Sequence, residues 1–165
     1  MQIKNHSFVA VFVFIGSLFI SIPLPAQDIS PETADKLKSI GEEMINATLS
    51  GNLLSLVDYY TEDVILKPDF QPEISGKKAL LAQYKQDLKK GIKYHAFSGQ
   101  VEKQWQCGDE IFEQGTFGMA VSAKDSPKPV AYYGSYFQIW QQAPDGSFLI
   151  SYVIWNLDFN PYDGH

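Results

Sequence analysis

The carboxyl-terminal part of the chain reads as one strand after another, with no helical pattern between the strands. Aromatic residues recur at alternate positions, and short turns interrupt the alternation. The pattern predicts four strands, Tyr94–Gln106, Ile111–Ala123, Val130–Gln142 and Phe148–Asn156, joined by turns at Cys107–Asp109, Asp125–Pro129 and Ala143–Gly146. Because these strands follow the helical segments instead of alternating with them, we expect an antiparallel sheet that helices cover on one side only. A sheet of this kind curls around a pocket.

Three segments that precede these strands are predicted to be helical. The first begins at Ser30-Pro31, with serine as the capping residue and proline in the first turn, and it ends at Gly51. The others are Leu53–Tyr60 and Lys77 to Lys90, separated by a short strand, Val64–Lys67, and a loop, Pro68–Pro72. Within the long strands we interpret three glycines as bend or bulge points, Gly115, Gly118 and Gly134.

The amino terminus has the pattern of a secretory signal peptide. Lys4 precedes an apolar run from Phe8 to Ile22, which is shorter than a membrane-spanning helix requires, and the small residue Ala26 stands before Gln27. We expect cleavage after Ala26, so that residues 1–26 are the signal and residues 27–165 form a single secreted or periplasmic domain without membrane attachment. An uncleaved amino-terminal anchor is the alternative interpretation.

The composition of the chain argues against several classes of binding partner and several kinds of chemical site. The formal net charge of −6 argues against nucleic acid and anionic membranes as partners. The chain has no arginine, so a strongly anionic substrate would lack its usual bidentate anchor. Cys107 is the only cysteine, which excludes an internal disulfide and leaves open whether it pairs across chains or simply packs at a hairpin. No spacing of metal ligands occurs, and we expect neither a metal nor a cofactor.

Several short motifs, taken in order, resemble one known family. They are Gly51-Asn52, Tyr60-Thr61-Glu62-Asp63-Val64, Ile74-Ser75-Gly76-Lys77-Lys78-Ala79, Gly108-Asp109, Gln114-Gly115-Thr116-Phe117, Gly134-Ser135-Tyr136, Asp145-Gly146 and Trp155-Asn156. Their order is similar to that of the SnoaL-like branch (polyketide cyclase and ketosteroid isomerase-like) of the nuclear-transport-factor-2-like superfamily. The resemblance implies an α+β cone, a cystatin-like roll in which three amino-terminal helices and a curved, mixed or antiparallel sheet enclose an apolar pocket. It also implies a homodimer through the outer face of the sheet.

The family includes isomerases, dehydratases and cyclases as well as domains without catalytic activity, so the fold does not select a function. At the position of the isomerase base this chain has Pro68, with Asp69 next to it. At the main oxyanion donor it has Met44, which cannot donate a hydrogen bond. The resemblance therefore leaves catalysis open, with Asp69 as one candidate base.

The resemblance also implies a set of residues around the ligand. It places Tyr60 and Tyr84 behind the oxyanion hole, Tyr136 at its second donor and Trp155 on the wall of the cavity. Strand alternation independently puts Tyr136 on the inner face, and Asn156 ends the last strand near the cavity. Phenols suit a cavity that orients a weakly polar ligand. The alternative interpretation is that Tyr60 and Tyr84 are core residues and that Asn156 only closes a turn.

Glu113 is the second candidate base. It lies in the otherwise apolar segment Ile111–Phe117. A carboxylate that faces a cavity has a raised pKa, which suits a general acid or base near neutral pH. The alternative is a solvated glutamate that points outward at an edge or at a dimer interface.

Three hypotheses for the function follow. The leading one is a secreted or periplasmic domain that binds a small, mostly apolar, uncharged or weakly polar molecule in its cone, with no assured catalysis. The second is a cofactor-independent isomerase, dehydratase or cyclase that uses a cavity carboxylate and tyrosine donors. The third is a non-catalytic dimerisation or interaction module whose cavity its own side chains fill.

Overall fold

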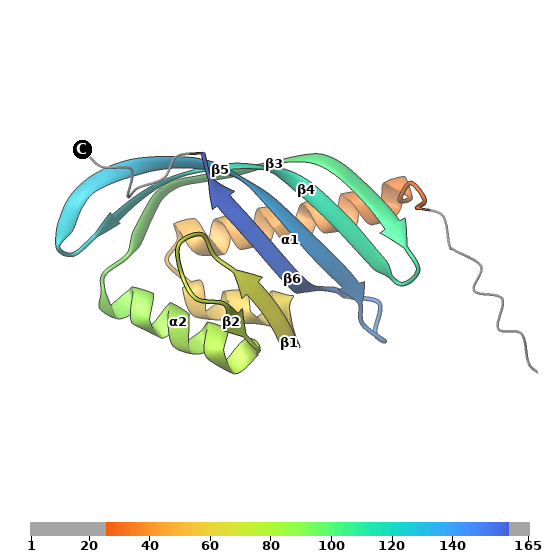
Figure 1. The fold of residues 1–165 in the computed structure, drawn as a ribbon, viewed down its shortest axis with the longest axis horizontal. Helices are drawn as coiled ribbons and strands as arrows, with labels where there is room; N and C mark the ends of the chain where they lie inside the picture. Colours follow the sequence, from red (N-terminus) through yellow and green to blue (C-terminus); the bar gives the residue numbers. More distant parts are fainter. Residues whose placement is uncertain (1–25, 159–165) are drawn as a thin grey trace, which may run out of the picture.

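The sheet dominates the architecture, and α1, η1 and α2 lie on one of its faces (Figure 1). A computed structural model of the chain describes residues 26–158, so the predicted signal peptide lies outside the described residues except for Ala26. The elements are α1 (Pro31–Leu49), the 3-10 helix η1 (Leu53–Tyr59), β1 (Tyr60–Lys67), β2 (Ile74–Ser75), α2 (Lys77–Lys89), β3 (Lys93–Cys107), β4 (Glu110–Ala123), β5 (Ser126–Gln142) and β6 (Phe148–Leu157). The strands form one sheet in the order β2-β1-β6-β5-β4-β3. The predicted α+β class, with three helices and a curved sheet, is confirmed.

Helix α1 begins and ends where the sequence predicts. The Ser30 hydroxyl accepts a hydrogen bond from the backbone N–H of Thr33 at 3.1 Å, and Pro31 is the first helical residue. At the other end Gly51 has a φ of 77°, which glycine adopts without strain, and Gly91 ends α2 in the same way with a φ of 65°. The chain continues into η1 after Gly51 and into β3 after Gly91.

The expected antiparallel pairing is confirmed for the four long strands, and the parallel pairing of β1 makes the sheet mixed, one of the two arrangements that the resemblance implies. Strands β3, β4, β5 and β6 pair antiparallel in sequence order, whereas β1 pairs parallel with β6. Strand β1 also begins at Tyr60, earlier than the predicted Val64, and Tyr60 pairs with Ile150. The parallel arrangement is possible because α2 and three long strands separate β1 from β6 in sequence, which gives the chain enough length to cross over.

The turn between β4 and β5 is shorter than predicted. Strand β5 begins at Ser126, and only Lys124 and Asp125 form the turn. Pro127 and Pro129 suggested a longer turn, but they lie in the part of β5 that precedes its pairing with β6. A proline is tolerated there because the strand has a free edge, where no N–H donor is needed.

The interpretation of the strand glycines as bulge points agrees with the register at Gly115 only. The register of β3 shifts between Val101, which pairs with Gly115, and Lys103, which pairs with Gln114, whereas no shift lies at Gly118 or Gly134. Two of the glycines leave room for aromatic rings. A Cβ on Gly115 would lie 2.8 Å from Cε1 of Tyr136, and a Cβ on Gly134 would lie 2.8 Å from Cζ of Phe117.

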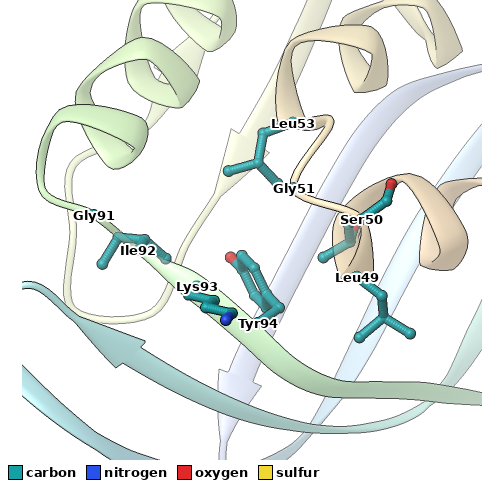
Figure 2. Close-up of a pocket in the computed structure, with 9 residues that line it drawn as sticks. Leu49, Ser50, Gly51, Leu53, Gly91, Ile92, Lys93 and Tyr94 are labelled. Atoms are coloured by element: carbon teal, nitrogen blue, oxygen red, sulfur yellow. The ribbon is translucent and has the colours of Figure 1, made fainter.

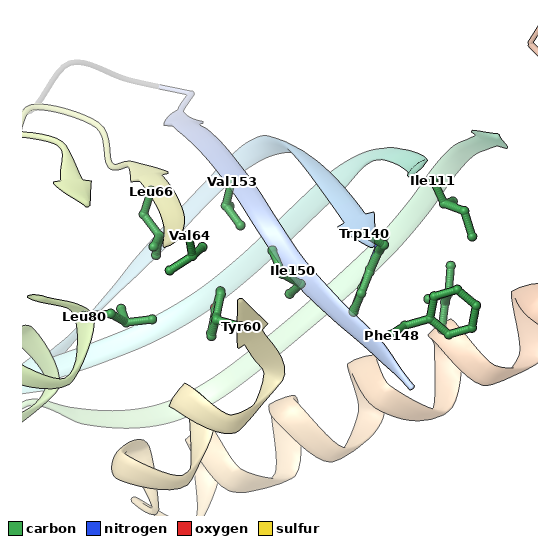
Figure 3. Packing of buried hydrophobic residues seen from close by; sticks show 10 residues of the cluster. Tyr60, Val64, Leu66, Leu80, Ile111, Trp140, Phe148, Ile150 and Val153 are labelled. Carbon is green, nitrogen blue, oxygen red and sulfur yellow. The ribbon is translucent and has the colours of Figure 1, made fainter. Parts of the chain in front are cut away.

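The hydrophobic core lies between the helices and one face of the sheet, which we call the inner face (Figure 3). The buried members of the core are Leu37, Tyr60, Val64, Leu66, Leu80, Ile111, Trp140, Phe148, Ile150 and Val153. Since neighbouring residues of a strand point to opposite faces, Ile111 and Trp140 fix which positions of β4 and β5 face inward.

The start of the described chain is attached to strand β3. The backbone N–H of Gln27 donates to the carbonyl of Gln106 at 2.9 Å, and the N–H of Gln106 donates to the carbonyl of Gln27 at 2.8 Å. Within residues 26–158, no helix combines the length and the apolar character that crossing a membrane requires.

Candidate functional site

A row of three polar side chains crosses the inner face from β3 to β5. Gln104, Glu113 and Gln138 are direct neighbours in the strand register. Nε2 of Gln104 donates to Oε2 of Glu113 at 2.6 Å, and Nε2 of Gln138 donates to Oε1 at 2.8 Å. Glu113 is only 4 % exposed. The alternative of a solvated glutamate that points outward is therefore wrong.

Two aromatic residues of β5 complete the shell around this carboxylate. The hydroxyl of Tyr136 donates to Oε1 of Glu113 at 2.8 Å, and the indole N–H of Trp140 donates to Oε2 at 3.2 Å. Tyr136 can reach the carboxylate because its ring lies over Gly115, where a side chain would block it. We call these residues the carboxylate cluster: Gln104, Glu113, Tyr136, Gln138 and Trp140.

The carboxylate cluster has the pattern of an ionised acid. Four donors occupy the four acceptor positions of the two Glu113 oxygens, and an indole N–H can only donate. Burial raises the pKa of Tyr136, and the charge of Glu113 and the hydrogen bond to it raise that pKa further, so the phenol keeps its proton. A substrate proton could reach this carboxylate only by displacing one of its donors.

Three phenols gather where the inner face meets the end of η1, helix α2 and the start of β3, and we call Tyr60, Tyr84 and Tyr94 the tyrosine cluster. Tyr60 belongs to the core, and Tyr84 packs against it. Burial is the main cause that raises the pKa of each phenol, and interactions with Tyr60 raise that of Tyr84 well above its usual value. The Tyr60 and Tyr84 hydroxyls meet in a hydrogen bond, which satisfies one buried polar group with another.

A hollow of about 300 Å³ opens beside the tyrosine cluster (Figure 2). Its lining comes from the end of α1, the start of η1 and the α2–β3 connection: Thr48, Leu49, Ser50, Gly51, Leu53, Gly91, Ile92, Lys93 and Tyr94. Thr48 and Leu53 are buried at its floor, whereas Leu49 and Lys93 are exposed at its rim. Sequence reasoning treated Tyr94 only as the start of a strand and missed its place here. The signal that could have found it is the pair of glycine turns, Gly51 and Gly91, which end two helices on one side of the sheet.

The hollow and the carboxylate cluster are separate. Tyr94 pairs with Val121, whereas Gln104 pairs with Glu113. Val121 is eight positions beyond Glu113 on β4, which corresponds to about 26 Å of strand length. Tyr94 and the hollow are therefore far along the strands from Glu113, whereas Tyr60 pairs with Ile150, the neighbour of Trp140 in the carboxylate cluster.

The other predicted residues lie around these two regions. Trp155 is the direct neighbour of Tyr136 across β5 and β6 and packs against the core, whereas the next residue, Asn156, is exposed. Asp69 Oδ2 accepts a hydrogen bond from the backbone N–H of Leu157 at 2.8 Å, so this carboxylate ties the loop after β1 to the end of β6. The structure thus brings Glu113, Tyr136 and Trp155 together, and separately Tyr60 and Tyr84. Their roles in binding stay predictions.

The outer face of the sheet carries aromatic residues of its own. Trp105 and Phe112 stack with their ring centroids 5.6 Å apart, and Phe137 lies 6.1 Å from each. The ammonium of Lys103 lies 5.2 Å from the centre of the Trp105 ring. We call Trp105, Phe112 and Phe137 the outer aromatic cluster. Cys107 is an exposed free thiol, and residues 26–158 contain no group of histidine, cysteine and acidic side chains that could hold a metal ion.

Comparison with known proteins finds similarity in structure only. No family model matches the sequence, and no curated protein matches it. A ketosteroid isomerase-like protein from Erwinia carotovora atroseptica has a TM-score of 0.69 at 13% identity, over 79% of this chain and 100% of that one. ActVI-ORFA from Streptomyces coelicolor has a TM-score of 0.64 at 14% identity, over 77% and 98% of the two chains. An NTF2-like protein from Cytophaga hutchinsonii has a TM-score of 0.59 at 12% identity, over 78% and 99%.

The TM-scores establish the fold, whereas sequence identities of 12–14% leave the activity open. The sequence resemblance and the structural neighbours agree on the same group of proteins, and they agree over nearly the whole of the described chain. This chain has the SnoaL-like, NTF2-like cone fold.

Proposed function

We propose that this chain is a binding domain for a small, mostly apolar, uncharged or weakly polar molecule, and that the hollow beside the tyrosine cluster holds it. The hollow itself is the observation that carries this proposal, because its volume of about 300 Å³ reaches the lower end of the range for ligand pockets. Leu49, Leu53 and Ile92 offer it apolar surface, and the Tyr94 phenol can orient a hydroxyl or carbonyl group.

Native mass spectrometry of the protein purified from its own host, with denaturing release of any bound molecule, tests this proposal. Once a ligand is known, Ile92→Trp fills the hollow and should weaken binding by about tenfold or more, because the indole occupies the space of the ligand. Leu54→Trp is the matched control, since Leu54 is exposed on η1 and does not line the hollow. Unchanged affinity in Ile92→Trp would place the ligand elsewhere, and a wild-type protein that binds no apolar molecule would end the proposal.

A cofactor-independent isomerase, dehydratase or cyclase is our second proposal, and the likeness to a ketosteroid isomerase-like protein supports it. The candidate bases are Glu113 and Asp69, and both already accept hydrogen bonds from the protein. Whichever of Glu113→Gln and Asp69→Asn removes the base should reduce turnover of a true substrate by about 100-fold or more, measured on variant protein that circular dichroism shows to be folded. A variant with wild-type turnover would remove that residue from the mechanism.

We also propose a homodimer formed through the outer face. The outer aromatic cluster offers apolar surface for such a contact, and Ile154 nearby in the sheet is 40 % exposed. Phe137→Lys should convert a dimer to a monomer in light scattering, while Leu54→Lys should leave the mass unchanged. A monomeric wild type would contradict the proposal. A dimer with an empty hollow would favour the third function, a non-catalytic interaction module.

Secretion is the last part of the proposal. The pairing of Gln27 with Gln106 supports it, because the residue that follows the expected cleavage site is already attached to the sheet. The intact mass of protein recovered from the periplasm or the medium should correspond to a chain that starts at Gln27. A full-length mass in the membrane fraction would favour the uncleaved anchor.

A further inference from the structure

The carboxylate cluster satisfies the hydrogen bonds of a charge without supplying the opposite charge. Every partner of Glu113 is neutral, and none of the four ion pairs among residues 26–158 involves it. A second acid, Glu102, lies near enough to contribute to the raised pKa of Tyr136. The adjacent Lys103 places its ammonium over Trp105, on the outer face. Glu113 therefore places a negative charge beside Tyr136 on the inner face, and no cation within the described residues is paired with it.

Two aromatic rings lie beside this charge. Tyr136 and Trp155 are direct neighbours across β5 and β6, and both are half-buried, so part of each side chain meets solvent. The faces of phenol and indole rings attract cations through their quadrupoles. The Tyr136 ring attracts a cation more strongly than a phenol without this hydrogen bond would, because donating a hydrogen bond to a carboxylate makes the ring more electron-rich.

We propose that Tyr136, Trp155 and Glu113 form a binding site for the protonated amine or quaternary ammonium end of an organic molecule. The cation lies against the two rings, and Glu113 attracts it through space while its oxygens keep their four hydrogen bonds. This site is distinct from the hollow, so an experiment that contradicts one of the two proposals leaves the other unaffected. The same charge disfavours an oxyanion at this place, which is the opposite of what the resemblance to the isomerase implies.

Three probes that share one carbon skeleton test the charge preference: phenethylamine, which is protonated at pH 7, 2-phenylethanol and phenylacetate. Each is titrated into the ¹⁵N-labelled protein, and binding is followed at the indole N–H of Trp155. We expect the ammonium to bind about tenfold more tightly than the alcohol, and phenylacetate to bind more weakly than either. Equal affinity for the three probes, or shifts at Leu53 and Tyr94 without shifts at Trp155, would overturn the proposal.

Variants assign the preference to this site. Glu113→Gln should bring the affinity for the ammonium down to that for the alcohol. Because this change sets an amide against four donors and can unfold the chain, Trp155→Leu provides a second measurement, with an expected loss of about tenfold for the ammonium. Glu110→Gln is the control, since Glu110 lies on β4 but points to the opposite face. A preference that survives in folded Trp155→Leu, or that disappears in Glu110→Gln, would refute the assignment.

Discussion

Two regions of the inner face show two ways in which one sheet can treat polar side chains. At the carboxylate cluster, four donors from β3 and β5 fill the acceptor positions of Glu113, so a ligand can hydrogen-bond to this carboxylate only by displacing one of them. At the tyrosine cluster, the phenols of Tyr60 and Tyr84 satisfy each other, and a hollow remains beside Tyr94. The first region is closed by its own hydrogen bonds, and the second is open because two helices end there.

The negative charge and the ligand-sized hollow therefore lie in different regions of the inner face. The carboxylate cluster offers a fixed negative charge and two half-buried rings, whereas the hollow offers volume and apolar surface. A ligand selected by charge and a ligand selected by shape would therefore bind at different ends of the same strands. Three substitutions test this contrast.

Removal of the buried acid should have the largest effect on stability. Glu113→Leu leaves the donors of Gln104, Gln138 and Trp140 facing an apolar side chain, and we expect the free energy of unfolding to fall by about 3–5 kcal/mol in urea titrations. Glu110→Leu, on the opposite face of the same strand, should cost less than about 1 kcal/mol. Equal losses in the two variants would show that the carboxylate cluster contributes no special stability.

A methyl group under Tyr136 should have the next largest effect. The Cβ of Gly115→Ala would collide with the carbonyl oxygen of Gln100 and lie 2.9 Å from the Tyr136 hydroxyl, so the strand or the ring must shift. We expect a loss of about 2–3 kcal/mol, as for other overpacked sites, measured by thermal and urea unfolding. Gly99→Ala is the control, because a Cβ there meets no atom within 4 Å. A Gly115→Ala protein as stable as the control would mean that Tyr136 does not need its position over the glycine.

The smallest effect concerns the tyrosine cluster at alkaline pH. Burial raises the pKa of Tyr84 well above 10, so the folded chain holds this proton more tightly than the unfolded chain does. The resulting stability is complete below pH 10 and is lost as the pH rises towards the folded-state pKa. Between pH 8 and pH 11 the wild type should lose about 1 kcal/mol more than Tyr84→Phe. Identical pH profiles, with the exposed Tyr133→Phe as reference, would show that Tyr84 is not held in this way.

The sequence predicted the elements better than it predicted the site. Capping and periodicity located α1 and α2 because these signals are local, and the alternation of aromatic residues located the long strands for the same reason. The parallel pairing of β1 depends on the position of β6 in the sheet, and β6 is too distant in sequence for a local pattern to predict this contact. The four donors around Glu113 come from two other strands, so only the register reveals them. The hollow was missed since it arises where two helix ends and the start of β3 meet.

Strand β3 has one further consequence, for solubility. It is the edge of the sheet, 15 residues long, and such an edge invites strands of other molecules to add to it and start aggregates. Two interruptions of its register, near His95 and Glu102, break the edge into short pieces, and Gln27 occupies the backbone groups of Gln106 near its end. A version of this domain that starts after Gln27 would keep its core but expose that end of β3, and it should aggregate at lower concentrations than the longer chain.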